Sequence, residues 1–255
     1  MKKRIAFFLA ALIIFAAGFY LVRLSGNKAI EPKTITFKSQ DNLTVTADLY
    51  MTKNAKAPYI ILFHQAKYSR GEYVSIAPVL NKIGFNCLAV DQRSGQGVNG
   101  IVNNTAKQAR ELKLQTSFKN TLPDMEASLN YVKNELKAEK IILWGSSYSA
   151  SLVFILAEKY PEYINGILSF SPGEYMRVED RKVEDFAKNI KCPVFITSTK
   201  SEESSWKSIY EKIPSENKAY YLPDFPGRHG SSALWDSYDK SSFYWEHVKK
   251  FLKKL

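Results

Sequence analysis

The chain contains only two cysteines and three histidines among its 255 residues. Cys87 stands inside one apolar run and Cys192 at the start of another, and neither belongs to a CxxC motif. We therefore expect two buried thiols rather than a disulfide or a metal-binding pair. The chain also lacks an HExxH motif and any cluster of histidine and cysteine, so the sequence predicts no metal site.

Nucleotide-binding loops and nucleic-acid-binding stripes are also missing. The only glycine-rich stretch, residues 94–100, lacks the strand and helix that frame a dinucleotide-binding loop, so we expect no cofactor. The net charge is +11, but five cations precede the first acidic residue and four lysines lie in the last seven residues. Residues 29–248 carry only about +2, without a basic stripe interleaved with aromatics, so no nucleic-acid partner is predicted.

Residues 1–32 are predicted to be a membrane-targeting segment. Three cations at residues 2–4 precede residues 5–22, an uninterrupted run of 18 residues without a charge. This length favours a membrane-spanning signal anchor, because cleaved signal peptides usually have a shorter apolar core. Small residues at 16–18 favour the alternative, a cleaved signal peptide. In both cases the domain from residue 33 onward is expected to be extracytoplasmic, either membrane-anchored or secreted or periplasmic.

Residues 33–255 alternate short apolar runs with segments of helical spacing, which is typical of one α/β domain. The pattern predicts an opening antiparallel hairpin and six further strands, at residues 34–37, 43–50, 59–63, 85–90, 141–144, 164–170, 194–197 and 219–222. Helices are expected at residues 72–83, 107–114, 124–136, 151–157 and 203–213, with a last one ending at residue 255. We therefore predict a doubly wound, mainly parallel sheet of about eight strands, with functional residues in the loops at the carboxyl ends of the strands.

A serine-rich turn separates the strand at 141–144 from the apolar run at 151–157. Residues 145–149 read G-S-S-Y-S, so Ser147 has a small residue two positions away on each side. A sharp strand-to-helix turn needs such small residues, and it presents the hydroxyl at its tip. The pattern resembles the nucleophile elbow of the α/β-hydrolase family, whose usual form is G-x-S-x-G. Ser149 departs from that form, and an ordinary β–α connection with helix-capping serines is the alternative.

A serine nucleophile needs a base within hydrogen-bond distance, and only three histidines are available. His247 falls in the last predicted helix, and His64 directly follows the third strand. His229 lies in the loop D-F-P-G-R-H-G after the last strand, where the resemblance places the catalytic histidine of the family. We therefore expect His229 to be the base, His64 to brace the oxyanion loop and His247 to be structural or exposed.

The resemblance also implies an acid and an oxyanion hole. In the α/β-hydrolase family the acid follows the penultimate core strand, where this chain has no aspartate; Glu202 matches, with Glu203 as the alternative. Both glutamates also suit the first turn of a helix. The oxyanion hole is expected to use the backbone N–H groups of Tyr148, which follows the nucleophile, and of Gln65, in the loop after the third strand.

These residues predict a serine hydrolase that cleaves a carboxylic ester or similar acyl substrate through an acyl-enzyme. The resemblance is to small esterases and dienelactone hydrolases, because the connection at residues 172–191 is only 20 residues long and leaves no room for a lid domain. One further hypothesis is that Arg70, Arg93 or Arg228 pairs with an acidic group of the substrate, and Arg93 is the one chosen to test it. An acyltransferase with the same residues and a catalytically silent binding domain on this fold are the alternatives.

Overall fold

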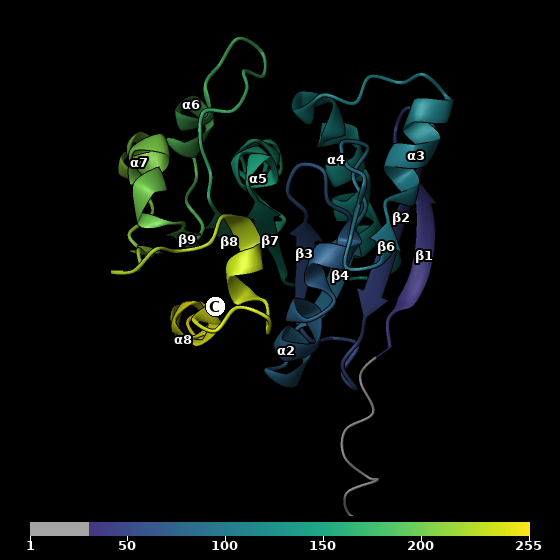
Figure 1. Cartoon of the computed structure of the whole chain (residues 1–255). Helices are drawn as coiled ribbons and strands as arrows, with labels where there is room; N and C mark the ends of the chain where they lie inside the picture. Colours follow the sequence, from purple (N-terminus) through teal and green to yellow (C-terminus); the bar gives the residue numbers. More distant parts are fainter. Residues whose placement is uncertain (1–30) are drawn as a thin grey trace, which may run out of the picture. The chain divides into compact units, whose positions relative to one another are not determined.

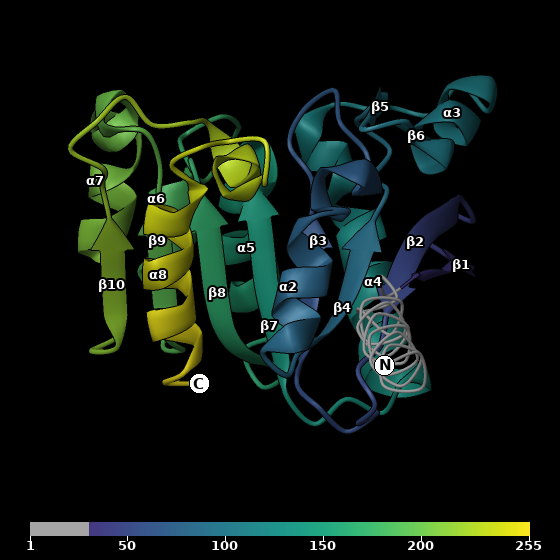
Figure 2. The ribbon, with the colours of Figure 1, turned by 60° about the horizontal axis from the view of Figure 1, so that its bottom comes forward.

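Eight strands form the central sheet of the computed structural model, which describes residues 31–255. Across the sheet they lie in the order β1-β2-β4-β3-β7-β8-β9-β10 (Figure 2). They are β1 (Lys33–Lys38), β2 (Thr44–Tyr50), β3 (Tyr59–Phe63), β4 (Asn86–Val90), β7 (Ile141–Ser146), β8 (Ile164–Phe170), β9 (Val194–Thr197) and β10 (Lys218–Tyr221). Neighbours from β4 to β10 pair in parallel, whereas β2 is antiparallel to both β1 and β4. The predicted mainly parallel, eight-stranded sheet is confirmed.

Helices cover both faces of this sheet (Figure 1). One face packs against α4 (Leu122–Asn130), α5 (Tyr148–Lys159), α6 (Val183–Ala187) and α7 (Glu203–Lys212). The other face packs against α2 (Ile76–Lys82) and α8 (Ser241–Leu252). Each face has its own cluster of buried apolar side chains. The result is a three-layer arrangement of helices, sheet and helices.

Strand β3 explains why its sequence is an unbroken apolar run. All of its residues are buried, and Ile61 enters the cluster under α4 and α5, whereas Ile60 and Leu62 enter the cluster under α2 and α8. A strand covered on both faces has no solvent side and therefore shows no polar alternation. Each fully buried isoleucine or leucine contributes about 1.5–3 kcal/mol of hydrophobic stabilisation.

The long connection between β4 and β7 contains more structure than expected. It holds a small ribbon of β5 (Gly97–Val98) and β6 (Ile101–Val102), followed by α3 (Asn104–Glu111) and the turn η2 (Phe118–Thr121). The predicted helix at 107–114 begins three residues earlier, because the Asn103 side chain accepts the Ala106 amide at 2.8 Å and caps it.

Two predicted helices are divided. The segment predicted at 124–136 forms α4 and then the π-helical turn η3 (Tyr131–Glu135). The segment predicted at 72–83 forms the short turn η1 (Arg70–Tyr73) and only then α2. The turn η1 begins early because the hydroxyl of Ser69 accepts the Gly71 amide at 3.1 Å. This break buries η1 beside the end of β3, which matters for the site described below.

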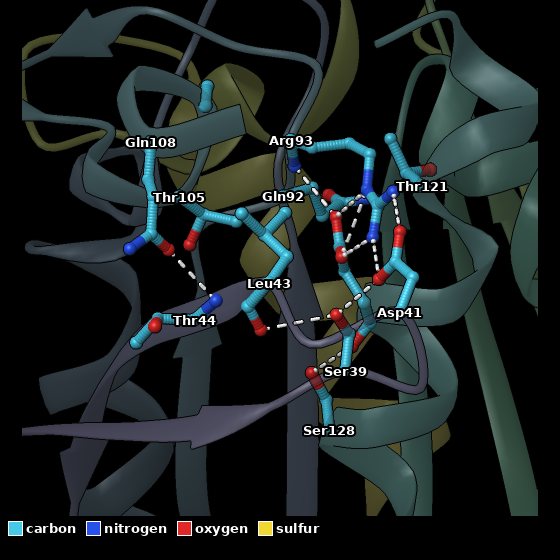
Figure 3. Close-up of polar contacts among 12 residues, drawn as sticks. Ser39, Asp41, Leu43, Thr44, Gln92, Arg93, Thr105, Gln108, Thr121 and Ser128 are labelled. Atoms are coloured by element: carbon cyan, nitrogen blue, oxygen red, sulfur yellow. Dashed lines mark hydrogen bonds and ion pairs between the residues drawn. The ribbon is translucent and has the colours of Figure 1, made fainter. Parts of the chain in front are cut away.

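Arg93, in the loop after β4, is buried between two carboxylates (Figure 3). Its guanidinium donates to Asp124 of α4 at 2.7 Å and to Asp41 of the β1–β2 turn at 2.6 Å. The backbone amide of Arg93 also donates to Asp124, at 2.8 Å. The hypothesis that Arg93 pairs with a substrate is therefore wrong. A buried guanidinium requires charged partners of its own, and this one ties the β1–β2 turn to α4.

The signal peptide or signal anchor expected in residues 1–32 falls almost entirely outside the described residues and stays a prediction. Within residues 31–255, no helix is long and apolar enough to cross a membrane. Cys87 and Cys192 are both free thiols. Cys87 is buried in β4, whereas Cys192, just before β9, is only partly buried, so the expectation of two buried thiols is wrong for Cys192.

Candidate active site

A sharp turn joins β7 to α5 and carries Ser147 at its tip. Ser147 has φ 58° and ψ −120°, and such strained conformations cost a non-glycine residue about 1–3 kcal/mol. Its amide donates to the Phe170 carbonyl of β8 at 2.8 Å, which holds the turn. A Cβ added to Gly145 would lie 2.6 Å from the Cα of Ala150, so only glycine fits where strand and helix cross. The predicted strand, turn and helix are therefore present around Ser147.

Glu202 and His229 meet from the loops that follow β9 and β10. Glu202 ends the turn η4 (Lys200–Glu202), and His229 immediately precedes the turn η5 (Gly230–Leu234). Nδ1 of His229 donates to Oε1 of Glu202 at 2.5 Å. Glu203 instead begins α7 and pairs at 3.7 Å with a lysine one turn further along the helix. The structure thus brings Glu202, and not Glu203, to the predicted base.

This contact sets the protonation of both side chains. Burial alone would raise the pKa of Glu202, but hydrogen bonds from His229 and from the Ser171 hydroxyl outweigh it and lower the pKa. The bond to Glu202 raises the pKa of His229, against the effect of burial. An ionised carboxylate can only accept, so Nδ1 of His229 carries the proton and Nε2 is left as an acceptor. A general base for a serine needs that tautomer.

The loop that carries His229 lies beside the elbow. The amide of Ser231, two residues after His229, donates to the hydroxyl of Ser146 at 2.8 Å. The hydroxyl of Ser231 accepts the indole N–H of Trp144 in β7, also at 2.8 Å. Ser146 and Trp144 belong to β7, the strand that directly precedes Ser147. These bonds therefore fix the His229 loop against the strand that leads to Ser147.

Tyr175 is a further side chain near the predicted nucleophile and the predicted acid. Its hydroxyl donates to the Ser171 carbonyl at 3.0 Å. Burial raises the pKa of Tyr175 and the charge of Glu202 raises it further, whereas a hydrogen bond with Ser147 opposes both effects. Ser147 and Glu202 therefore both influence the pKa of Tyr175.

The two predicted oxyanion donors differ in whether their N–H groups are free. The Tyr148 amide, at the start of α5, donates to no acceptor among the described residues. The Gln65 amide, however, donates to the carboxylate of Glu72 at 2.8 Å, so its predicted role is wrong in this conformation. The next amide in the loop, that of Ala66, has no acceptor within residues 31–255 and is the available donor. The loop's own sequence does not show this one-residue shift, because Glu72 reaches it from the following turn.

The other two histidines do not take part in this constellation. His64 is fully buried, which lowers its pKa to about 4, and its Nε2 accepts the Gln92 amide at 3.0 Å. Its Nδ1 donates to the Gln65 carbonyl at 2.8 Å, so His64 braces the oxyanion loop as expected. His247 is partly buried on α8 and stacks on Tyr221 with ring centroids 3.9 Å apart. Within residues 31–255 no group of three or more His, Cys, Asp or Glu side chains could hold a metal ion.

A hollow of about 290 Å³ lies next to the oxyanion loop. It is bordered by Ala66 and by Phe118, whose ring stacks on Tyr148 at a centroid distance of 4.4 Å. Its lining contains the cations Lys67 and Arg110 beside the neutralised Arg93, and no carboxylate. The hollow therefore borders Ala66, one of the two candidate oxyanion donors, and its free charges are positive.

A strained serine between strand and helix, with a histidine and a carboxylate from the loops after the last two strands, is the arrangement of an α/β hydrolase. The family model described as "alpha/beta hydrolase fold" matches residues 58–232, more than half of the chain. The protein belongs to the α/β-hydrolase fold family. A search of curated protein sequences finds no match to this chain.

Solved structures with the same fold include an esterase and a dienelactone hydrolase. The Pyrococcus furiosus esterase Pf2001 has a TM-score of 0.67 and 20% identity, covering 90% of this chain and 96% of that one. Est1E from Butyrivibrio proteoclasticus, with bound ferulic acid, has a TM-score of 0.67 and 18% identity over 86% of this chain and 98% of that one. The dienelactone hydrolase from Anabaena variabilis has a TM-score of 0.68 and 12% identity, covering 88% of this chain and 98% of that one. The resemblance to this esterase-like branch is thereby confirmed at the level of fold.

Proposed function

We propose that this protein is a serine hydrolase that cleaves a carboxylic ester or similar acyl substrate. The observation that carries the proposal is the hydrogen bond between His229 and Glu202, formed beside the strained turn of Ser147. A histidine held by a carboxylate next to a serine at the tip of a strained turn is the arrangement that activates a serine hydroxyl. The similar folds of an esterase and a dienelactone hydrolase support the same class of reaction.

In this mechanism Oγ of Ser147 attacks the ester carbonyl while Nε2 of His229 takes its proton. Glu202 keeps the imidazole in the required tautomer and stabilises the imidazolium that forms. The amides of Tyr148 and Ala66 donate to the developing oxyanion. The imidazolium then protonates the leaving alcohol, and a water activated by His229 releases the acid from the acyl-enzyme.

A fluorophosphonate probe tests the nucleophile directly. The full chain is expected to be labelled, and Ser147→Ala is expected to lose the label completely. Ser201→Ala is the matched control, because Ser201 lies in η4 and, within residues 31–255, its hydroxyl forms a hydrogen bond only with Thr199. Absence of label in the parent protein would instead favour the silent binding domain. Product transfer to an added alcohol, in place of water, would favour the acyltransferase.

The hollow beside Ala66 is the proposed site for one end of the substrate. Its volume of about 290 Å³ suits a small acyl or alcohol group. Lys67 and Arg110 are the cations in its lining that two carboxylates do not neutralise, so an ester with a negatively charged group is the favoured substrate. A panel of chromogenic esters that differ in chain length and in charge tests this assignment.

We also propose that the enzyme works outside the cytoplasm, because of the apolar run at residues 5–22. Protease accessibility in intact cells and in spheroplasts tests the location, and degradation only after the cytoplasmic membrane is broken would contradict it. The mass of the mature protein then separates a retained anchor from a cleaved signal peptide.

A further inference from the structure

Glu72 is a fully buried carboxylate for which the proposed mechanism has no use. It lies in the turn η1, between β3 and α2. Its Oε2 accepts the amide of Gln65 at 2.8 Å, and its Oε1 accepts the hydroxyl of Ser146 at 2.7 Å. Both contacts are to residues that directly precede groups of the reaction in the chain, since Ala66 follows Gln65 and Ser147 follows Ser146.

The same residue also reaches the loop of the base. The hydroxyl of Ser146, which donates to Glu72, accepts the amide of Ser231 from the His229 loop at 2.8 Å. The backbone carbonyl of Glu72 accepts the indole N–H of Trp235, just after η5, at 2.8 Å. One residue therefore connects the oxyanion loop, the elbow and the histidine loop, which come from three distant parts of the chain.

If the side chain of Glu72 only filled space, an apolar residue would be expected at this buried position. Within residues 31–255, Glu72 has no lysine or arginine partner, and a buried charge without a cation is costly. Burial raises the pKa of Glu72 to about 7, although the bonds from Ser146 and Gln65 and the charge of His229 oppose this. The titratable groups that face Glu72 are His229, Tyr68, Tyr73 and Tyr148.

We propose that Glu72 is a positioning residue, which aims the Ala66 amide at the oxyanion and holds the Ser147 and His229 loops in register. The proposal rests on the function proposed above. By holding the amide of Gln65, Glu72 fixes the conformation of the loop that also carries the next amide, that of Ala66. By holding Ser146, it fixes the residue before the nucleophile and, through Ser231, the loop of the base.

The hydrogen bonds do not depend on the charge of Glu72. When the carboxyl group is protonated, it can donate to Oγ of Ser146, which has a free lone pair, and still accept the Gln65 amide. A glutamine can do the same, because its NH₂ donates to Ser146 and its carbonyl oxygen accepts from Gln65. Glu72→Gln therefore keeps the positioning and removes the negative charge, whereas Glu72→Leu removes both.

The experiment compares kcat and KM for a chromogenic ester in the full chain, in Glu72→Gln and in Glu72→Leu, normalised to sites titrated by the fluorophosphonate. Glu72→Leu is expected to lower kcat about 10²-fold, as for loss of an oxyanion donor, with KM changed by less than about threefold. Glu72→Gln is expected to keep kcat within about fivefold of the parent. Because the charge of Glu72 raises the pKa of His229, the acidic limb of kcat/KM should move to lower pH in Glu72→Gln.

Hydrogen–deuterium exchange provides a readout that does not need activity. Peptides spanning residues 64–70 and 228–235 should exchange faster in Glu72→Leu than in the parent. In Glu72→Gln they should exchange at the parent's rate. If Glu72→Leu does not fold, Ser146→Ala replaces it, because this change cuts the link to the elbow and the His229 loop and should lower kcat without raising KM. Equal kcat in the parent and the leucine variant, or equal exchange of the two peptides in both, would overturn the proposal. If the parent protein is inactive and is not labelled by the fluorophosphonate, but both peptides are protected from exchange, the hydrolase assignment is wrong and the structural role of Glu72 still stands.

Discussion

Replacing Glu202 with glutamine tests the link between the acid and the base. The carboxylate of Glu202 accepts three hydrogen bonds, from Nδ1 of His229 at 2.5 Å, the Ser171 hydroxyl at 2.8 Å and the Thr199 amide at 3.2 Å. A glutamine must turn its NH₂ toward one of these donors. The Thr199 amide cannot accept, so the NH₂ faces His229, and Nδ1 must then become the acceptor.

The tautomer then places the proton on Nε2, where His229 cannot receive the proton of Ser147. In a Ser-His-Asp triad the equivalent change costs about 10⁴-fold in kcat, which corresponds to about 5.5 kcal/mol. Since Glu202 is only partly buried, we expect a loss of about 10³–10⁴-fold in Glu202→Gln. Steady-state hydrolysis of a chromogenic ester, normalised to titrated active sites, measures this loss.

The neighbouring Glu203 provides the matched control. It lies in the first turn of α7, apart from His229, so Glu203→Gln should leave kcat unchanged. Because Glu202 raises the pKa of His229, the acidic limb of kcat/KM lies above pH 6.5 in the parent and should move to lower pH in Glu202→Gln. A loss of less than tenfold in Glu202→Gln, or an equal loss in Glu203→Gln, would refute the reasoning.

Three further changes test the fold and the substrate site. Gly145→Ala should lower the free energy of unfolding by about 1–3 kcal/mol in urea titrations, because its Cβ meets rigid backbone; an unchanged midpoint would contradict the crowding at the elbow. Arg93→Ala should cost about 3–5 kcal/mol by leaving two carboxylates unpaired, with equal KM changes for anionic and neutral esters; a selective change would restore a substrate role. Lys67→Ala and Arg110→Ala should raise KM for anionic esters only, and equal effects on neutral esters would remove the hollow as an anionic subsite.

Much of the fold could be predicted because burial leaves a direct trace in the sequence. A strand covered on both faces, such as β3, must be an unbroken apolar run, and all eight strands were expected near their observed positions. The elbow was equally visible, since strand and helix cross so closely that Gly145 admits no side chain. The division of residues 72–83 was not visible, because it depends on a cap from Ser69 that competes with helical periodicity.

The sequence by itself determined the strand order along the chain and the tight turn of Ser147, because these depend on local patterns. The prediction of His229 came instead from the resemblance to the α/β-hydrolase family. Only the tertiary structure decided between Glu202 and Glu203. It also paired Arg93 with Asp41 and Asp124, and it placed the carboxylate of Glu72 where the Gln65 amide donates to it. Each of those outcomes depends on the direction of a side chain relative to a segment far away in the chain. Adjacent residues in a turn point in different directions, and packing alone selects which of them meets its partner.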